Sequence, residues 1–77
     1  MPGRRPEIRA RNPLVREAFE RMDKLPGTVE LHGEAAGVNA WIIGKWRKGV
    51  VEPRLCNFIA LVTALGGRIT IEWKDKP

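Results

Sequence analysis

The sequence predicts a mainly α-helical domain of four helices, followed by one C-terminal β-strand. Three observations support this fold class. Apolar residues recur every three or four positions between residues 13 and 65, residues that cap or break helices stand between these stretches, and the apolar residues alternate strictly in residues 68–73. A chain of 77 residues, 43% of them hydrophobic, suits one small domain with a marginal core. We expect a flexible basic arm at 1–11, the helical domain at 12–67, and the strand with its tail at 68–77.

The first helix is expected to begin at Asn12-Pro13, because asparagine caps helices and proline is tolerated in the first turn. Its apolar residues continue to about Lys24, and Pro26-Gly27 ends it. Thr28 caps a second, short helix that ends at Ala36-Gly37.

Asn39 caps the predicted third helix, which runs from Ala40 to about Lys48 and is closed by Gly49. Pro53 stands at the start of a fourth helix, which ends at Gly66-Gly67. Its apolar residues have the 3–4 spacing of a packed helix and are Leu55, Phe58, Ile59, Val62 and Leu65.

The last segment changes period, since Ile69, Ile71 and Trp73 alternate with polar residues as in a half-buried strand. A single strand needs a partner for its backbone groups. The sequence leaves two partners open: the same strand of a second copy, or the arm around Ile8.

Positive charge is concentrated in two blocks within a net charge of +5. Residues 1–11 carry four arginines against Glu7, and residues 41–54 carry four cations against Glu52, which gives each block a net +3. Such clustering is typical of a surface that binds a polyanion. The arginines of the arm are Arg4, Arg5, Arg9 and Arg11. We expect them to track a DNA backbone or enter a minor groove, and the alternative is a disordered tail that only aids solubility.

Successive residues of an α-helix lie about 100° apart around the helix axis, and this spacing divides the third helix into two faces. Asn39, Ile42, Ile43 and Trp46 share one arc, which predicts the packing face. The opposite side carries Trp41, Gly44, Lys45 and Lys48. It therefore presents two cations and an indole ring, and at Gly44 it has no side chain.

Several classes of protein are disfavoured by the residues present. The chain has one cysteine and one histidine, Cys56 and His32, so we expect neither a disulfide, a metal site nor a cofactor. No arrangement of nucleophile and base or of paired carboxylates predicts an enzyme, and no small-molecule substrate is indicated. No apolar run approaches the length of a membrane span, and a reducing cytoplasm suits the composition.

Two helices joined by a short turn containing glycine form a helix-turn-helix, here residues 28–36, Gly37-Val38 and the helix after Asn39. The second helix of such a unit lies in the DNA major groove. We expect Ala40, Trp41, Gly44 and Lys45 to meet the bases, with a place in the core or in a dimer interface as the alternative for Trp41. The predicted phosphate contacts are Thr28, Asn39, Arg47, Lys48 and Arg54.

Residues 13–66 resemble the lambda-repressor-like, Cro-type helix-turn-helix proteins of the XRE family. The resemblance rests on the stretch from Thr28 to Asn39, on Ile43 and Trp46, and on the later Gly49, Pro53 and Leu65-Gly66. It implies that Ala40, Trp41 and Lys45 occupy base-reading positions. Val29, His32 and Gly33 depart from the family, which more often has glutamine, a buried leucine and alanine at these places.

The resemblance implies a regulator of transcription in a bacterium or phage, associated with the nucleoid and binding an approximately palindromic operator as a homodimer. In a Cro-like subgroup a C-terminal strand joins the two subunits, and Ile69, Ile71 and Trp73 would form its apolar side. The alternative is an antitoxin or another protein-interaction module built on the same fold.

Overall fold

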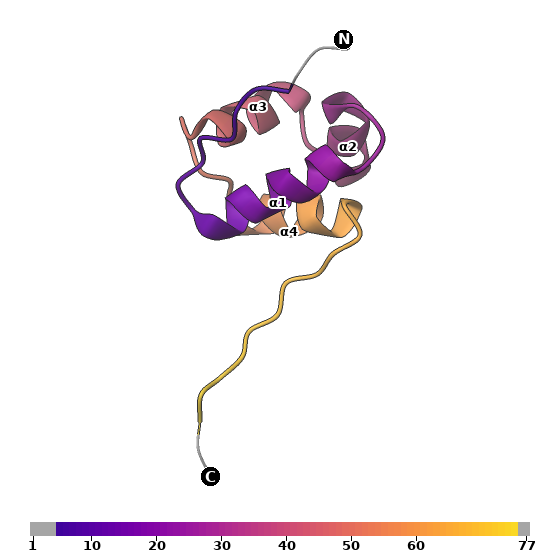
Figure 1. Cartoon of the computed structure of the whole chain (residues 1–77). Coiled ribbons are helices and arrows are strands. Elements are labelled where there is room, and N and C mark those ends of the chain that lie inside the picture. The colour runs from indigo at the N-terminus through magenta and orange to yellow at the C-terminus, as the bar shows by residue number, and fades with distance from the viewer. Residues whose placement is uncertain (1–4, 76–77) are drawn as a thin grey trace.

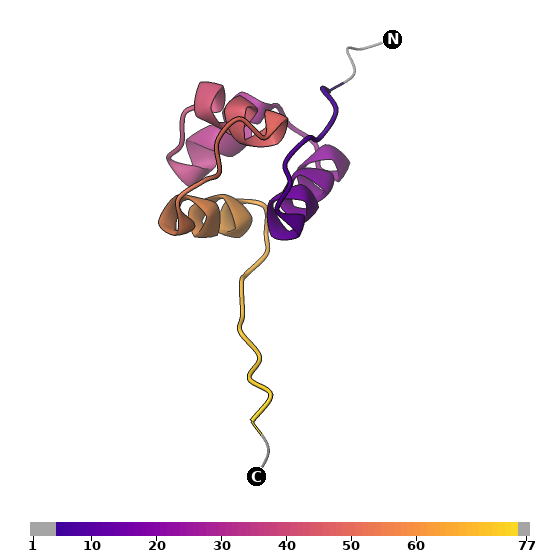
Figure 2. The ribbon, with the colours of Figure 1, turned by 90° about the vertical axis from the view of Figure 1, so that its left-hand side faces the viewer.

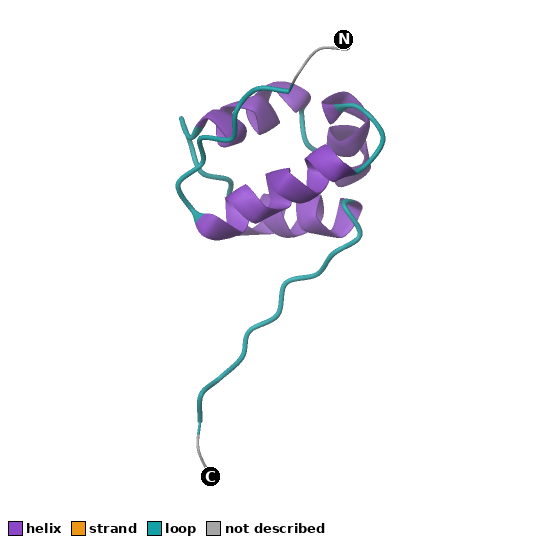
Figure 3. Ribbon diagram, in the orientation of Figure 1, coloured by secondary structure: helices purple, strands orange, loops and turns teal. Residues whose placement is uncertain are grey.

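The computed structural model describes residues 5–75 and confirms the mainly helical prediction. Four helices follow one another: α1 (Pro13–Lys24), α2 (Val29–Ala36), α3 (Ala40–Lys48) and α4 (Leu55–Ala64). They form one bundle, with α3 and α4 on opposite sides of the view in Figure 1. Within residues 5–75 no segment is a β-strand (Figure 3).

Local capping explains where the helices begin and end. The side chains of Asn12, Thr28 and Asn39 accept hydrogen bonds from the first-turn amides of α1, α2 and α3, at 2.9, 3.2 and 2.7 Å. Gly37 and Gly49 end α2 and α3 in the left-handed conformation, which glycine adopts without steric cost. The fourth helix starts at Leu55 rather than at Pro53, and no side chain caps it.

The core is formed mainly by α1, α3 and α4. Phe19 and Met22 of α1, Ile43 of α3 and Leu61 of α4 are its fully buried large side chains. Trp46 joins them, so the prediction that Ile43 and Trp46 anchor the third helix is confirmed, whereas Ile42 is half-buried and Asn39 is an exposed cap. Leu55 and Ile59, which were expected to pack, are instead exposed, and so is Leu14 in the first turn of α1.

Gly33 lets α2 and α3 pack closely. A Cβ atom there would lie 2.5 Å from the carbonyl oxygen of Val38 and 3.0 Å from Cδ1 of Ile43. Alanine, which the related family more often has here, would favour the helix more than glycine does. The close approach of the Val38 carbonyl explains why glycine stands at this position.

The expectation of a free arm does not hold for residues 5–11, which lie along α1 and α3 (Figure 1). The amide of Arg9 donates to the carbonyl of Arg47 at 2.7 Å, and the Arg16 guanidinium donates to the carbonyls of Ile8 and Ala10 at 2.9 and 3.2 Å. Ala10 is buried and Ile8 half-buried. Apolar contact and backbone pairing therefore hold this segment to the domain.

The C-terminal segment leaves the bundle after α4 and extends away from it in both views (Figures 1 and 2). Residues 68–75 are exposed and have no assigned secondary structure. On the apolar side of the expected strand, Ile71 and Trp73 are 71% and 76% exposed. Only Ile69, at 38%, lies beside the bundle, where it lines a hollow between α1 and α4.

Candidate nucleic-acid interface

The outer face of α3 comprises Trp41, Gly44, Lys45 and Lys48, of which Trp41 and Lys48 are exposed and Gly44 and Lys45 are half-buried. Trp41 is 69% exposed, although it is followed in the chain by half-buried Ile42 and buried Ile43. Because Ile43 and Trp46 insert into the core, the rotation of α3 about its axis is determined and the opposite side turns outward.

Trp41 and Lys45 form a pair on this face. The Lys45 ammonium lies 4.5 Å from the centre of the Trp41 ring, a cation–π contact between residues one helical turn apart. The pair presents a large flat apolar surface beside a positive charge. This combination suits a ligand that carries both apolar edges and negative charge.

The residues at the centre of the outer face of α3 have small side chains, so little stands between the helix backbone and the surface. Gly44 has open space around the position of a Cβ atom, with nothing within 4 Å. Ala40 is half-buried one turn earlier. The backbone of α3 can therefore come close to a second molecule at this point.

The two capping residues predicted to touch phosphates retain free donors. Thr28 accepts the amide of Leu31 through its hydroxyl oxygen, and Asn39 accepts the amide of Trp41 through its carbonyl oxygen. The hydroxyl hydrogen of threonine and the amide NH₂ of asparagine are donors that these caps do not use. Both residues are exposed.

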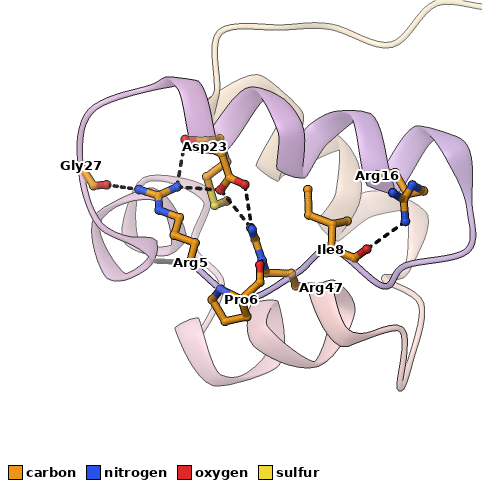
Figure 4. A network of polar contacts seen from close by, with 8 residues as sticks. Arg5, Pro6, Ile8, Arg16, Asp23, Gly27 and Arg47 are labelled. Atoms are coloured by element: carbon orange, nitrogen blue, oxygen red, sulfur yellow. Dashed lines mark hydrogen bonds and ion pairs between the residues drawn. The ribbon is translucent and has the colours of Figure 1, made fainter. Parts of the chain in front are cut away.

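Arg47 does not belong to the outer face, and its predicted phosphate contact is contradicted by its position. The residue is 5% exposed, and its guanidinium donates to Asp23 of α1 from Nη1 and Nη2 at 3.0 and 2.7 Å (Figure 4). Its Nε donates to the carbonyl of Pro6 at 2.7 Å, and its Cζ lies 5.5 Å from the centre of the Phe19 ring. Every part of the guanidinium is thus engaged inside the protein.

Arg5 is likewise occupied within the protein. It donates to the carbonyls of Met22 and Gly27 at 3.0 and 2.6 Å and to the Asp23 carboxylate at 3.2 Å (Figure 4). A cation at the carbonyl end of α1 is favoured by the helix dipole. Arg5 therefore binds the N-terminal segment to the end of α1 and is not a cation free to contact DNA.

The carboxylate of Asp23 joins both arginines. Its hydrogen bonds from Arg47 hold the pKa of Asp23 below its ordinary value, Arg5 adds to this effect, and partial burial opposes it. The ionised carboxylate thus connects α1, α3 and residues 5–6.

The remaining predicted cations are placed differently. Arg9 and Arg11 are exposed, and Arg9 lies 3.6 Å from Glu7 in an ion pair open to solvent. Lys48 and Arg54 are exposed as well. Arg4 lies outside the described residues.

The ion pairs of Asp23 were not predicted from the sequence, although the position of this residue gave an indication of them. It is an acid in the last turn of a helix, where the dipole disfavours negative charge. A carboxylate in that place, next to buried Met22, indicates a cationic partner. The sequence does not indicate which arginine this is, because the partner is distant in the chain.

Comparisons with protein-family models, with curated proteins and with solved structures found no match for this chain. Within residues 5–75, no three potential ligands among histidine, cysteine, aspartate and glutamate gather as a metal would require. None of the described helices has the length and apolar character needed to cross a lipid bilayer.

Proposed function

We propose that the protein is a sequence-specific DNA-binding regulator of transcription, in which α2 and α3 form a helix-turn-helix and α3 enters the major groove. The observation that carries this proposal is the outer face of α3: an exposed indole and two lysines around an open glycine, on a helix whose rotation the core determines.

The chemistry of this face matches that of base edges in a groove. Lys45 can donate to guanine O6 and N7, and Trp41 and Ala40 offer apolar contact to thymine methyl groups. The open space at Gly44 allows the backbone to approach the groove floor. These four residues are the base-reading set of the proposal.

Phosphate contacts come from exposed donors around the base-reading set. We assign these contacts to Thr28, Asn39, Lys48 and Arg54. Arg9 and Arg11 of the N-terminal segment are exposed and supply further contacts to the DNA backbone. Arg47 and Arg5 are left out because both bind within the protein. The number of free cations is therefore smaller than the sequence suggested.

The proposed assembly is a homodimer in a bacterial or phage-infected cytoplasm, where the single free, exposed Cys56 stays reduced. A two-fold dimer places its recognition helices about one DNA turn apart, on an approximately palindromic site. In this proposal the segment 68–75 becomes a strand on dimerisation.

Selection of bound sites from random double-stranded DNA by the full chain tests the function. We expect enrichment of a palindrome whose half-sites are separated by about 10 base pairs. The Lys45→Ala variant is expected to relax preference at one position of each half-site, whereas Lys24→Ala, an exposed lysine on α1, leaves the preference unchanged. If no sequence is enriched, the proposal is overturned, and the alternative of a protein-interaction module or antitoxin takes its place.

Thymine contact has its own test on the selected site. Replacing each thymine by uracil removes one methyl group, and loss of the contact with Trp41 is expected to weaken binding about three- to fourfold. Trp41→Ala should abolish this methyl effect, while Leu31→Ala, another exposed apolar residue, should retain it. An equal methyl effect in both variants would exclude Trp41 as the reader.

A further inference from the structure

We propose that residues 5–10 form a strap that holds the C-terminal end of α3 in position, and that specific DNA binding depends on this strap through its contacts inside the protein. Arg5 and Arg47 are then positioning residues, which act on the outer face of α3 without touching DNA. The consequence for DNA rests on the proposed function, whereas the strap itself can be measured on the chain alone.

The end of α3 depends on contacts from outside the helix. The helix has only nine residues, and so short a helix is stabilised mainly by its packing against the rest of the protein. Its last carbonyl groups also need partners that the helix cannot supply. Amides of the following turn bind the carbonyls of Lys45 and Trp46, but the carbonyl of Arg47 receives the amide of Arg9 at 2.7 Å. The strap therefore completes the end of α3.

The strap holds Arg47 at two places. Its amide at Arg9 binds the Arg47 carbonyl, and its carbonyl at Pro6 accepts from Nε of Arg47 at 2.7 Å (Figure 4). The other guanidinium donors of Arg47 bind Asp23 of α1. Because both the backbone and the side chain of one residue are bound, the end of α3 cannot turn about the helix axis or move away from α1 without breaking these hydrogen bonds.

The strap is itself anchored at both ends. At its first residue, Arg5 donates to one carbonyl in the last turn of α1 and to one in the loop after it, at 3.0 and 2.6 Å (Figure 4). At its other end, the Arg16 guanidinium binds the carbonyls of Ile8 and Ala10, and both of these residues pack on the core. The contacts with Arg47 lie between the two anchors, so loss of the anchor at Arg5 should loosen them.

Gly49, which ends α3, lies directly against the strap. A Cβ atom on Gly49 would lie 2.6 Å from the carbonyl oxygen of Arg9 and 3.6 Å from the Cα of Ala10. Gly37 ends α2 in the same left-handed conformation, with φ 73° against 77°, but a Cβ atom there would have nothing within 4 Å. The two glycines thus have the same backbone conformation and differ in contact with the strap, which makes them a matched pair for substitution.

The strap bears on the proposed base-reading face because that face extends to the end of α3. Lys45 and Lys48 both lie in the last turn of the helix, with Arg47 between them. When the strap is released, only a fraction of the molecules keeps this turn in the binding orientation, and the specific affinity falls by that fraction. Nonspecific binding depends on the number of cations at phosphates, so it is not lowered. Arg5 therefore controls specificity although its guanidinium binds within the protein.

Amide hydrogen exchange of the full chain without DNA tests the strap, with the Leu61 amide in the core helix α4 as the internal reference. Arg5→Gln removes the anchor and should lower the protection of the Arg9 amide relative to Leu61 about tenfold. Arg11→Gln removes the same charge from an exposed residue next to the strap and should leave this ratio unchanged. Arg5→Lys keeps a cationic donor and should restore part of the protection. An unchanged ratio in Arg5→Gln, or an equal loss in Arg11→Gln, would overturn the proposal.

The glycine pair tests the other side of the strap. Gly49→Ala and Gly37→Ala should both lower stability, because alanine is strained at positive φ. Only Gly49→Ala pushes against the Arg9 carbonyl, so only this variant should lower the protection of the Arg9 amide relative to that of Leu61. A ratio that falls equally in the two variants would show that the strap does not lie on Gly49, and the proposal would fail.

DNA binding then separates the strap from the proposed function. For the selected site, Arg5→Gln should lower the ratio of specific to nonspecific affinity about three- to tenfold, with the salt dependence unchanged. Arg11→Gln should keep this ratio, and its negative slope of log K against log salt should become smaller in magnitude by about 0.9. Loss of Arg9 protection with an unchanged affinity ratio would overturn the role of the strap in recognition alone. A strap that responds as expected, in a chain that enriches no DNA sequence, would overturn the proposed function and with it the consequence for DNA.

Discussion

The Arg47 guanidinium and the Asp23 carboxylate form a two-point ion pair between α3 and α1, with N–O distances of 3.0 and 2.7 Å (Figure 4). The third donor of Arg47 binds the carbonyl of Pro6. Fork-to-carboxylate pairs of this kind are directional as well as strong. The pair therefore joins the helix with the proposed base-reading face to α1 and to the N-terminal segment.

Asp23→Asn should lower the free energy of unfolding by about 1–3 kcal/mol, because it leaves the buried charge of Arg47 without its counter-ion. Glu20→Gln removes an exposed acid from the same helix and should change stability by less than about 0.5 kcal/mol. Urea unfolding followed by circular dichroism measures both. Equal effects would mean that Asp23 contributes no more than a surface charge.

The contribution of Asp23 should depend on pH in a defined direction. Since the pKa of Asp23 is lowered in the folded protein, the ion pair stabilises the fold above the ordinary value of 3.8 and loses this effect as the pH falls through the lowered pKa. The difference in unfolding free energy between the native chain and Asp23→Asn is thus expected to be constant near neutrality and to shrink in acid. A difference that grows in acid would contradict this assignment.

Two glycines of the helices should respond in opposite ways to alanine. Gly33→Ala forces a methyl group onto the Val38 carbonyl and should cost about 1–3 kcal/mol despite the better helix propensity of alanine. Gly44→Ala meets open space and should raise stability by up to about 1 kcal/mol. Thermal unfolding of both variants tests the contrast, and a stabilised Gly33→Ala would show that α2 and α3 are not so closely packed.

The two tryptophans of α3 should differ sharply when replaced by alanine. Trp46→Ala removes a buried core side chain and should cost about 3–5 kcal/mol. Trp41→Ala loses only an exposed ring and its contact with Lys45, so we expect a cost of about 0.5–1 kcal/mol. Denaturant titrations of the two variants would contradict the predicted rotation of α3 if the costs were similar.

The salt dependence of DNA binding should separate Lys48 from Arg47. If Lys48 contacts a phosphate, the negative slope of log K against log salt should become smaller in magnitude by about 0.9 in Lys48→Ala. Arg47→Met should leave the slope unchanged, because the guanidinium binds Asp23 and not DNA. Binding titrations at several salt concentrations measure this, and a reduced slope for Arg47→Met would indicate that the ion pair opens on the nucleic acid.

The positions of the helices could be predicted from local signals. Asn12, Thr28 and Asn39 cap the expected helices, and Gly37 and Gly49 end two of them. Such signals act within one helical turn, so neighbours in sequence suffice to predict them. The outward position of Trp41 was likewise predictable, because helical periodicity alone separates it from Ile43 and Trp46.

The functions of individual charges could not be predicted in the same way. Arg47 and Lys48 are adjacent in sequence and equally cationic, yet one is buried and the other exposed. The two faces predicted for this helix include Lys48 but not Arg47, and only the packing of α1 beside α3 brings the carboxylate of Asp23 to Arg47. Exposed Leu14 and Ile59 show the same limit, since apolar spacing does not tell which side of a helix lacks a neighbour.

The amino-acid sequence by itself therefore determined the four helices, their ends and the two faces of α3, because these depend on interactions within a few residues. Only the tertiary structure decided that residues 5–11 lie against the domain, that Gly33 is needed for close packing and that Arg47 faces inward. These depend on contacts between distant segments: Asp23 and Arg47 are 24 positions apart, and Pro6 and Arg47 are 41 apart. The packed fold alone brings such groups within hydrogen-bonding distance, and a buried cation must then find its partners there.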